Sequence, residues 1–145
     1  MPRPEKRLAR ERLNIAQLIG VALVTRGFIV LDLDRGHAEG VDGVASFAAL
    51  VNAQGGDFPD HCPCVRTRRG GIHLYIASPA GVELRSSTSR IAPGVDIKAG
   101  RSLVTCPPTD GYSWIKPLIP IAELPPPPEW AGARGPSTAV AISDS

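Results

Sequence analysis

The sequence predicts an α+β fold in which strands outnumber helices and form an antiparallel or mixed sheet. Short apolar runs bounded by glycine or proline recur along the chain, and such runs are typical of strands. One segment after Asp42 instead has apolar residues at helical spacing. With 145 residues, 43% of them hydrophobic, the chain suits one domain with loose ends.

The first half of the chain predicts two strands and one helix. Residues 18–25 and 28–34 are apolar runs separated by Arg26-Gly27, and we expect them to pair as a hairpin. Asp42 is the expected N-cap of the helix, because an aspartate accepts hydrogen bonds from the free N–H groups of a first turn. Gly55-Gly56 is expected to end that helix.

The second half predicts five short strands. They are expected in residues 64–77 (two strands around Gly70-Gly71), 94–108 (two strands) and 111–115 (one strand). Pro107-Pro108 ends the fourth of these, because proline has no N–H to donate to a strand partner. The residues between Ala77 and Pro93 are polar and are expected to form a loop.

The domain boundaries follow from composition. Residues 1–13 are charged and predict a tail or short helix, residues 14–130 a folded domain, and residues 131–145 a flexible tail. No apolar run is long enough to cross a bilayer, and no signal peptide opens the chain. The three cysteines are therefore expected to be reduced thiols, and the protein to be cytoplasmic. A net charge of +2 is too small to indicate a nucleic-acid partner by itself.

Two aspartates, Asp32 and Asp34, end the apolar strand that begins at Phe28. Alternate residues of a strand share a face, so their Cβ atoms should lie roughly 6–7 Å apart. Ionised carboxylates in an apolar setting are costly unless something positive lies against them. Either the pair caps the turn at Arg35-Gly36, or it binds two divalent cations, Mg²⁺ or Mn²⁺, which prefer carboxylate oxygens.

A third carboxylate lies on a later strand. Asp96 stands between the apolar residues Val95 and Ile97, so its side chain should face away from theirs. It could complete a two-metal site. The alternative is an ion pair with Lys98 on the same strand face.

Two arginines precede another predicted strand, and that strand contains a histidine. His73 follows Gly70-Gly71, and Arg68 and Arg69 precede it. Glycine beside arginine and histidine suits a triphosphate, although a single strand histidine is more often merely solvated or satisfied. Arg68, Arg69 and Lys98 are candidates for phosphate contacts by charge and placement.

The segment "HCPC", residues 61–64, raises the possibility of zinc. Structural zinc takes four ligands, usually as two spaced pairs, and only three stand here, with Cys106 remote in sequence. We therefore expect the cysteines to be incidental.

Three motifs in order, "FIVLDLD", "VRTRRGGIHLYI" and "PGVDIKAGRSLVTCPPT", resemble those of the archaeo-eukaryotic primase superfamily, specifically its bifunctional primase–polymerase domain from phage, plasmid and prophage replication proteins. "YSW" and "LPPPPEW" are similar to the end of that domain. The resemblance covers about residues 14–130, and the three motifs together are more specific than any one of them.

The resemblance implies a primase-like core with an RNA-recognition-motif-like unit. Asp32, Asp34 and Asp96 would be the catalytic metal ligands, and His73 would contact the phosphates of the incoming nucleotide. The implied reaction is attack of a 3′-hydroxyl on an α-phosphate, directed by a single-stranded DNA template. The implied partners are that template, nucleoside triphosphates and a replicative helicase acting in trans.

Two alternatives remain. The stretch before the first motif is shorter than in most members. The loop of the third motif usually has a glycine-rich turn and an aromatic residue, and this chain has Gly100-Arg101-Ser102-Leu103 there instead. The enzyme is the main interpretation, and these departures make the first alternative a shortened, catalytically weak accessory protein that binds nucleotide or DNA in a replication complex. A metal-dependent nuclease ranks last, because no adjacent histidine pair accompanies Tyr75 or Tyr112.

Overall fold

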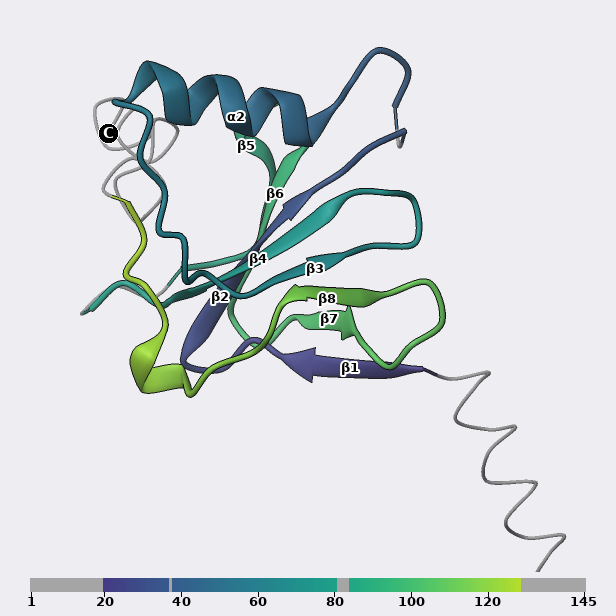
Figure 1. The fold of residues 1–145 in the computed structure, drawn as a ribbon, viewed down its shortest axis with the longest axis vertical. Helices are drawn as coiled ribbons and strands as arrows, with labels where there is room; N and C mark the ends of the chain where they lie inside the picture. Colours follow the sequence, from purple (N-terminus) through teal and green to yellow (C-terminus); the bar gives the residue numbers. More distant parts are fainter. Residues whose placement is uncertain (1–19, 37, 81–83, 129–145) are drawn as a thin grey trace, which may run out of the picture.

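Two antiparallel sheets and one α-helix make up the part of the chain described by the computed structural model, which is residues 20–36, 38–80 and 84–128 (Figure 1). The elements are β1 (Val21–Val24), β2 (Phe28–Leu33), α2 (Gly43–Ala53), β3 (Cys64–Arg66), β4 (Ile72–Ala77), β5 (Ser87–Ala92), β6 (Val95–Lys98), β7 (Leu103–Cys106), β8 (Ser113–Lys116) and a 3₁₀-helix, η1 (Ile121–Glu123). The larger sheet has the order β5-β6-β2-β4-β3-β8, and β1 and β7 form the smaller one. The α+β prediction is confirmed.

The predicted hairpin between β1 and β2 is wrong. β1 pairs with β7, with Val21 opposite Cys106 and Val24 opposite Leu103. β2 is flanked by β4 on one side and β6 on the other, so it has no free edge for β1. The chain turns at Gly27, which has a φ of +80°, and passes from the smaller sheet into the larger one.

Helix α2 begins where the sequence predicts. The Asp42 side chain accepts hydrogen bonds from the N–H groups of Val44 and Ala45, at 3.0 and 3.1 Å. Phe47 is buried against the sheet, and the helix ends at Ala53 before the two glycines. α2 covers the β5, β6 and β2 part of one sheet face (Figure 1).

One strand lies where a loop was predicted. β5 is an edge strand whose first four residues are polar, and Thr88, Ser89 and Arg90 are exposed. Only Ile91, near its end, is buried, so the strand has no apolar alternation to mark it. The five strands predicted after residue 63 are present as β3, β4, β6, β7 and β8, whereas the predicted tails, 1–13 and 131–145, lie outside the described residues.

Strand β2 runs through the centre of the larger sheet and contributes to two apolar clusters. Ile29, Leu31 and Leu33 pack in the cluster beneath α2, while Phe28 and Val30 pack on the opposite face. The opposite face turns polar at Asp32. The central strand therefore carries its first carboxylate at one end of an otherwise apolar surface. No helix among the described residues is long and apolar enough to cross a membrane.

Candidate active site

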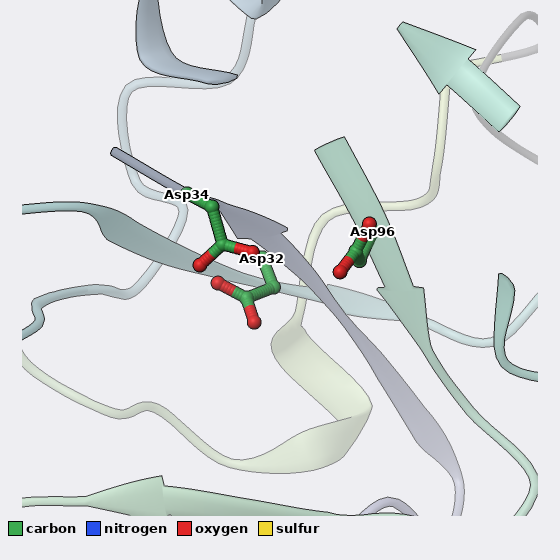
Figure 2. Close-up of side chains that lie close together, drawn as sticks. All are labelled: Asp32, Asp34 and Asp96. Atoms are coloured by element: carbon green, nitrogen blue, oxygen red, sulfur yellow. The ribbon is translucent and has the colours of Figure 1, made fainter. Parts of the chain in front are cut away.

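Three carboxylates converge at one end of the larger sheet. Asp32 lies on β2, Asp34 directly follows it, and Asp96 lies on β6 opposite Asp32. Their nearest oxygens all lie within 4.8 Å of one another, and all three residues are partly buried (Figure 2). Like charges this close repel one another, so a cation between them would lower the free energy of the site. An all-oxygen ligand set of this kind fits Mg²⁺ or Mn²⁺.

His73 extends this cluster across a third strand. It lies on β4 opposite Asp32, so Asp96, Asp32 and His73 form one row across β6, β2 and β4. Nε2 of His73 is 3.2 Å from Oδ1 of Asp32, and only 8% of the histidine side chain is exposed. An N–H on Nε2 would donate to the carboxylate and fix its orientation. Nδ1 is buried and has no hydrogen-bond partner among the described residues.

Two glycines hold Asp34 and Asp96 in place. The Asp34 N–H donates to the carbonyl of Gly94 at 2.9 Å, and the Gly43 N–H donates to the carbonyl of Asp34 at 2.6 Å. A Cβ on Gly43 would lie 2.1 Å from the Gly94 oxygen. The start of α2 and the β5–β6 turn can approach this closely only because both residues are glycine.

Ser89 orients the third carboxylate. Its N–H donates to Oδ1 of Asp96 at 2.9 Å, and its hydroxyl accepts from the Gly94 N–H at 3.1 Å. Ser89 has a φ of 51°, which is unusual for a residue other than glycine. Among the described residues no ion pair joins Asp96 to Lys98, so the alternative role of Asp96 receives no support.

A basic pocket of about 190 Å³ adjoins the carboxylates. Its lining residues are Asp32, Asp34, Thr67, Arg68, Arg69, His73 and Tyr112. Nε and Nη2 of Arg68 donate to the carbonyl of Asp110 at 3.2 and 2.8 Å, and its guanidinium lies 5.6 Å from the centre of the Tyr112 ring. The β7–β8 loop thus fixes Arg68 beside the carboxylates. The structure brings together all the predicted site residues except Lys98, which lines neither this pocket nor the next.

A second pocket, without basic side chains, also adjoins the carboxylates. It measures about 260 Å³ and shares Asp34 and Asp96 with the site, and no basic side chain lines it. Its remaining lining residues are Ala38, Val41, Thr88, Ser89, Pro93 and Gly94. The carboxylates therefore line both pockets, and arginine side chains line only the first of them.

Sequence reasoning missed several of these residues. Thr67 stands inside the second motif, but nothing in its position marked it. Tyr112 reaches the site because β8 pairs with β3, and Ser89 reaches it because β5 pairs with β6. Both pairings are non-local, so no local pattern would have found either residue.

The cysteines do not form a metal cluster with His61 among the described residues. The Cys62 thiol donates to the carbonyl of Tyr75 at 3.2 Å. Burial, together with the nearby Cys64 thiol, raises the pKa of Cys62 to about 12. Zinc binds the thiolate, so a thiol held protonated is a poor ligand.

Comparison with known proteins agrees with the motifs. The family model for the bifunctional DNA primase/polymerase N-terminal domain matches residues 4–130, which include all the described elements and every residue of the site. No curated protein and no solved structure matches the chain. The family match spans most of the sequence and includes all three residues of the acidic triad. The chain therefore belongs to the bifunctional DNA primase/polymerase N-terminal domain family.

Proposed function

We propose that the protein is a metal-dependent primase–polymerase that joins nucleotides on a single-stranded DNA template. The observation that carries this proposal is the acidic triad, whose oxygens lie within 4.8 Å of one another beside a basic pocket. Residues 14–130 would be the catalytic domain. The setting would be phage, plasmid or prophage replication, with a helicase acting in trans in the cytoplasm.

Asp32, Asp34 and Asp96 would hold Mg²⁺ or Mn²⁺. When bound, the metal would lower the pKa of the attacking 3′-hydroxyl and offset negative charge at the α-phosphate. The bond from the 3′-oxygen to the α-phosphorus forms as the bond to the leaving pyrophosphate breaks. His73 would keep the Asp32 carboxylate oriented through Nε2. Its ring, which lines the basic pocket, would contact the nucleotide phosphates.

The basic pocket suits the triphosphate. Arg68 is held by the Asp110 carbonyl, so its charge is placed before any substrate arrives. Arg69 is exposed and makes no salt bridge with a described residue. Guanidinium groups bind phosphate oxygens in a bidentate manner, so this pair would orient the leaving group. Lys98, which lies outside the pocket, would contact phosphate only further along the substrate.

The proposal is tested by incorporation of labelled nucleotides on single-stranded and primed DNA with Mg²⁺ or Mn²⁺. We expect Asp32→Asn to lower incorporation by at least about 100-fold, because the variant keeps the size of the side chain but loses a charged ligand. Asp57→Asn, in an exposed loop, is the matched control and should behave as the wild type. Circular dichroism confirms that each variant is folded.

The results separate the two interpretations. Undiminished synthesis by Asp32→Asn would refute the proposed site. A folded wild-type protein that binds nucleotide but incorporates none with either metal would instead favour the accessory role.

A further inference from the structure

A second charged pocket lies at the opposite end of β2. Its volume is about 490 Å³, and its lining residues are Thr25, Arg26, Gly27, Phe28, Ile29, Ser78, Leu84, Ala99, Gly100 and Arg101. Asp32 is four residues from Phe28, which is about 13 Å along a strand. No lining residue is acidic, and none belongs to the triad or to the basic pocket beside it.

Two turns build this pocket and hold each other in place. The Thr25 N–H donates to the carbonyl of Ser102 at 2.9 Å, and the Arg101 N–H donates to the carbonyl of Thr25 at 3.0 Å. Arg101 has a φ of 68°, a costly conformation for a residue other than glycine. Ser86 braces the second turn, since its hydroxyl donates to the Ala99 carbonyl at 3.0 Å. The backbone beneath the two arginines is therefore fixed.

The pocket carries positive charge that the described residues do not neutralise. Arg26 and Arg101 are exposed, and neither makes a salt bridge or a side-chain hydrogen bond with a described residue. Arg85 lies beside the same turn, with its Cα 4.0 Å from the position of a Cβ built on Gly100. The Thr25 hydroxyl is buried and has no hydrogen-bond partner among the described residues. The Arg26 and Arg101 guanidiniums are donors without acceptors among the described residues, so the ligand that they fit is an anion.

We propose that this pocket binds a phosphodiester group of single-stranded DNA at a distance from the reaction centre. The inference rests on the proposed function, which supplies the single strand. A nucleoside triphosphate fits less well, because no carboxylate lines the pocket to share a divalent cation with it. Two guanidiniums on separate turns instead suit the repeated charges of a DNA backbone.

Binding of fluorescein-labelled oligothymidylate, followed by anisotropy at several salt concentrations, tests the inference. We expect Arg26→Ala/Arg101→Ala to weaken binding and to reduce the slope of log K against log salt by about 1.4, or about 0.7 for each lost phosphate contact. Arg26→Lys/Arg101→Lys keeps both charges and should keep the slope. Arg66→Ala removes one exposed charge from β3 and is the matched control.

Three results would overturn the inference. The slope could stay at its wild-type value in the double alanine variant, or Arg66→Ala could lower it as much. Inorganic phosphate could also displace the DNA more strongly than chloride at equal ionic strength, which would indicate a small-anion site. Binding is read without turnover, so a reduced slope alongside undiminished synthesis by Asp32→Asn would support this pocket while refuting the proposed catalytic site.

Discussion

His73 is the residue on which two roles meet. Its Nε2 lies 3.2 Å from Asp32, and its ring lines the basic pocket, so it touches both the proposed metal ligand and the proposed phosphate site. A partner that orients a metal ligand typically changes metal affinity by 10–100-fold when it is removed. A phosphate contact would instead change the KM for the nucleotide.

We expect His73→Ala to weaken Mn²⁺ binding by about 10–100-fold, because Asp32 loses the group that orients it. His73→Gln can still donate an N–H and should recover part of the affinity. Isothermal titration with Mn²⁺ in the absence of nucleotide measures this. Unchanged Mn²⁺ affinity in His73→Ala, with a raised nucleotide KM, would assign the residue to the phosphates alone.

The cap residue Asp42 should make the stability of the protein depend on pH. The Ala45 N–H, with help from Arg35 and Val44, holds the pKa of Asp42 below the usual range of an aspartate. A lowered folded pKa means that the cap stabilises the protein above the unfolded pKa and that this stabilisation is lost as the pH falls through the folded pKa. We therefore expect Asp42→Ala to destabilise the protein at pH 7 and to differ little from the wild type near pH 2.

Urea unfolding at the two pH values measures this difference. Asp42→Asn is the control, because asparagine also caps helices but does not ionise. A stability gap between wild type and Asp42→Ala that did not narrow at low pH would contradict the role of the ionised cap.

At the scale of elements, local patterns predicted what local forces determine. β2 was marked by a run of buried residues between glycines, and α2 by a cap and an apolar face. β5 was not predicted, because its exposed polar residues show no alternation of apolar and polar side chains. The partner of β1 was not predicted either, because it depends on which sheet edges the other strands leave free. The carboxylates and cations of the site were likewise predicted, whereas Ser89, Gly43 and Tyr112 depend on contacts between distant segments.

The close contact between α2 and the β5–β6 turn leaves no room for a larger side chain at Gly43. Gly43→Ala would place a Cβ 2.1 Å from the Gly94 oxygen and 2.8 Å from the Asp34 nitrogen. We expect a loss of about 1–3 kcal/mol in the free energy of unfolding, as for other overpacked sites, together with weaker Mn²⁺ binding. Chemical denaturation and Mn²⁺ titration measure the two effects.

Ala49→Ser adds one heavy atom to an exposed position of the same helix. It should lower the free energy of unfolding by no more than about 0.5 kcal/mol, through helix propensity, and leave Mn²⁺ binding unchanged. A Gly43→Ala protein with normal stability and normal Mn²⁺ affinity would show that the close approach does not position Asp34 and Asp96.

The whole molecule separates its charges along the central strand. Three carboxylates cluster at one end of β2, and Arg26 and Arg101 lie at the other. In the proposed function a nucleic acid strand would need cations along its backbone, while the reaction would need metal ions at one point, and the two ends of β2 would meet these two needs separately. The carboxylate end is consequently under repulsion whenever no cation occupies it.

That repulsion predicts how the fold responds to metal. We expect Asp96→Asn to raise the metal-free Tm by a few degrees, because about 1 kcal/mol of relieved repulsion corresponds to roughly 4 °C in a domain of about 100 residues. The asparagine oxygen can still accept from the Ser89 N–H. Mn²⁺ at 100 times its Kd should stabilise the wild type by about 2.7 kcal/mol and the variant much less. Thermal melts with Mn²⁺ and with a chelator measure both effects. Equal Mn²⁺-induced shifts of Tm in the two proteins would mean that Asp96 is no metal ligand. A lower metal-free Tm in the variant would mean that the Asp96 charge stabilises the metal-free fold.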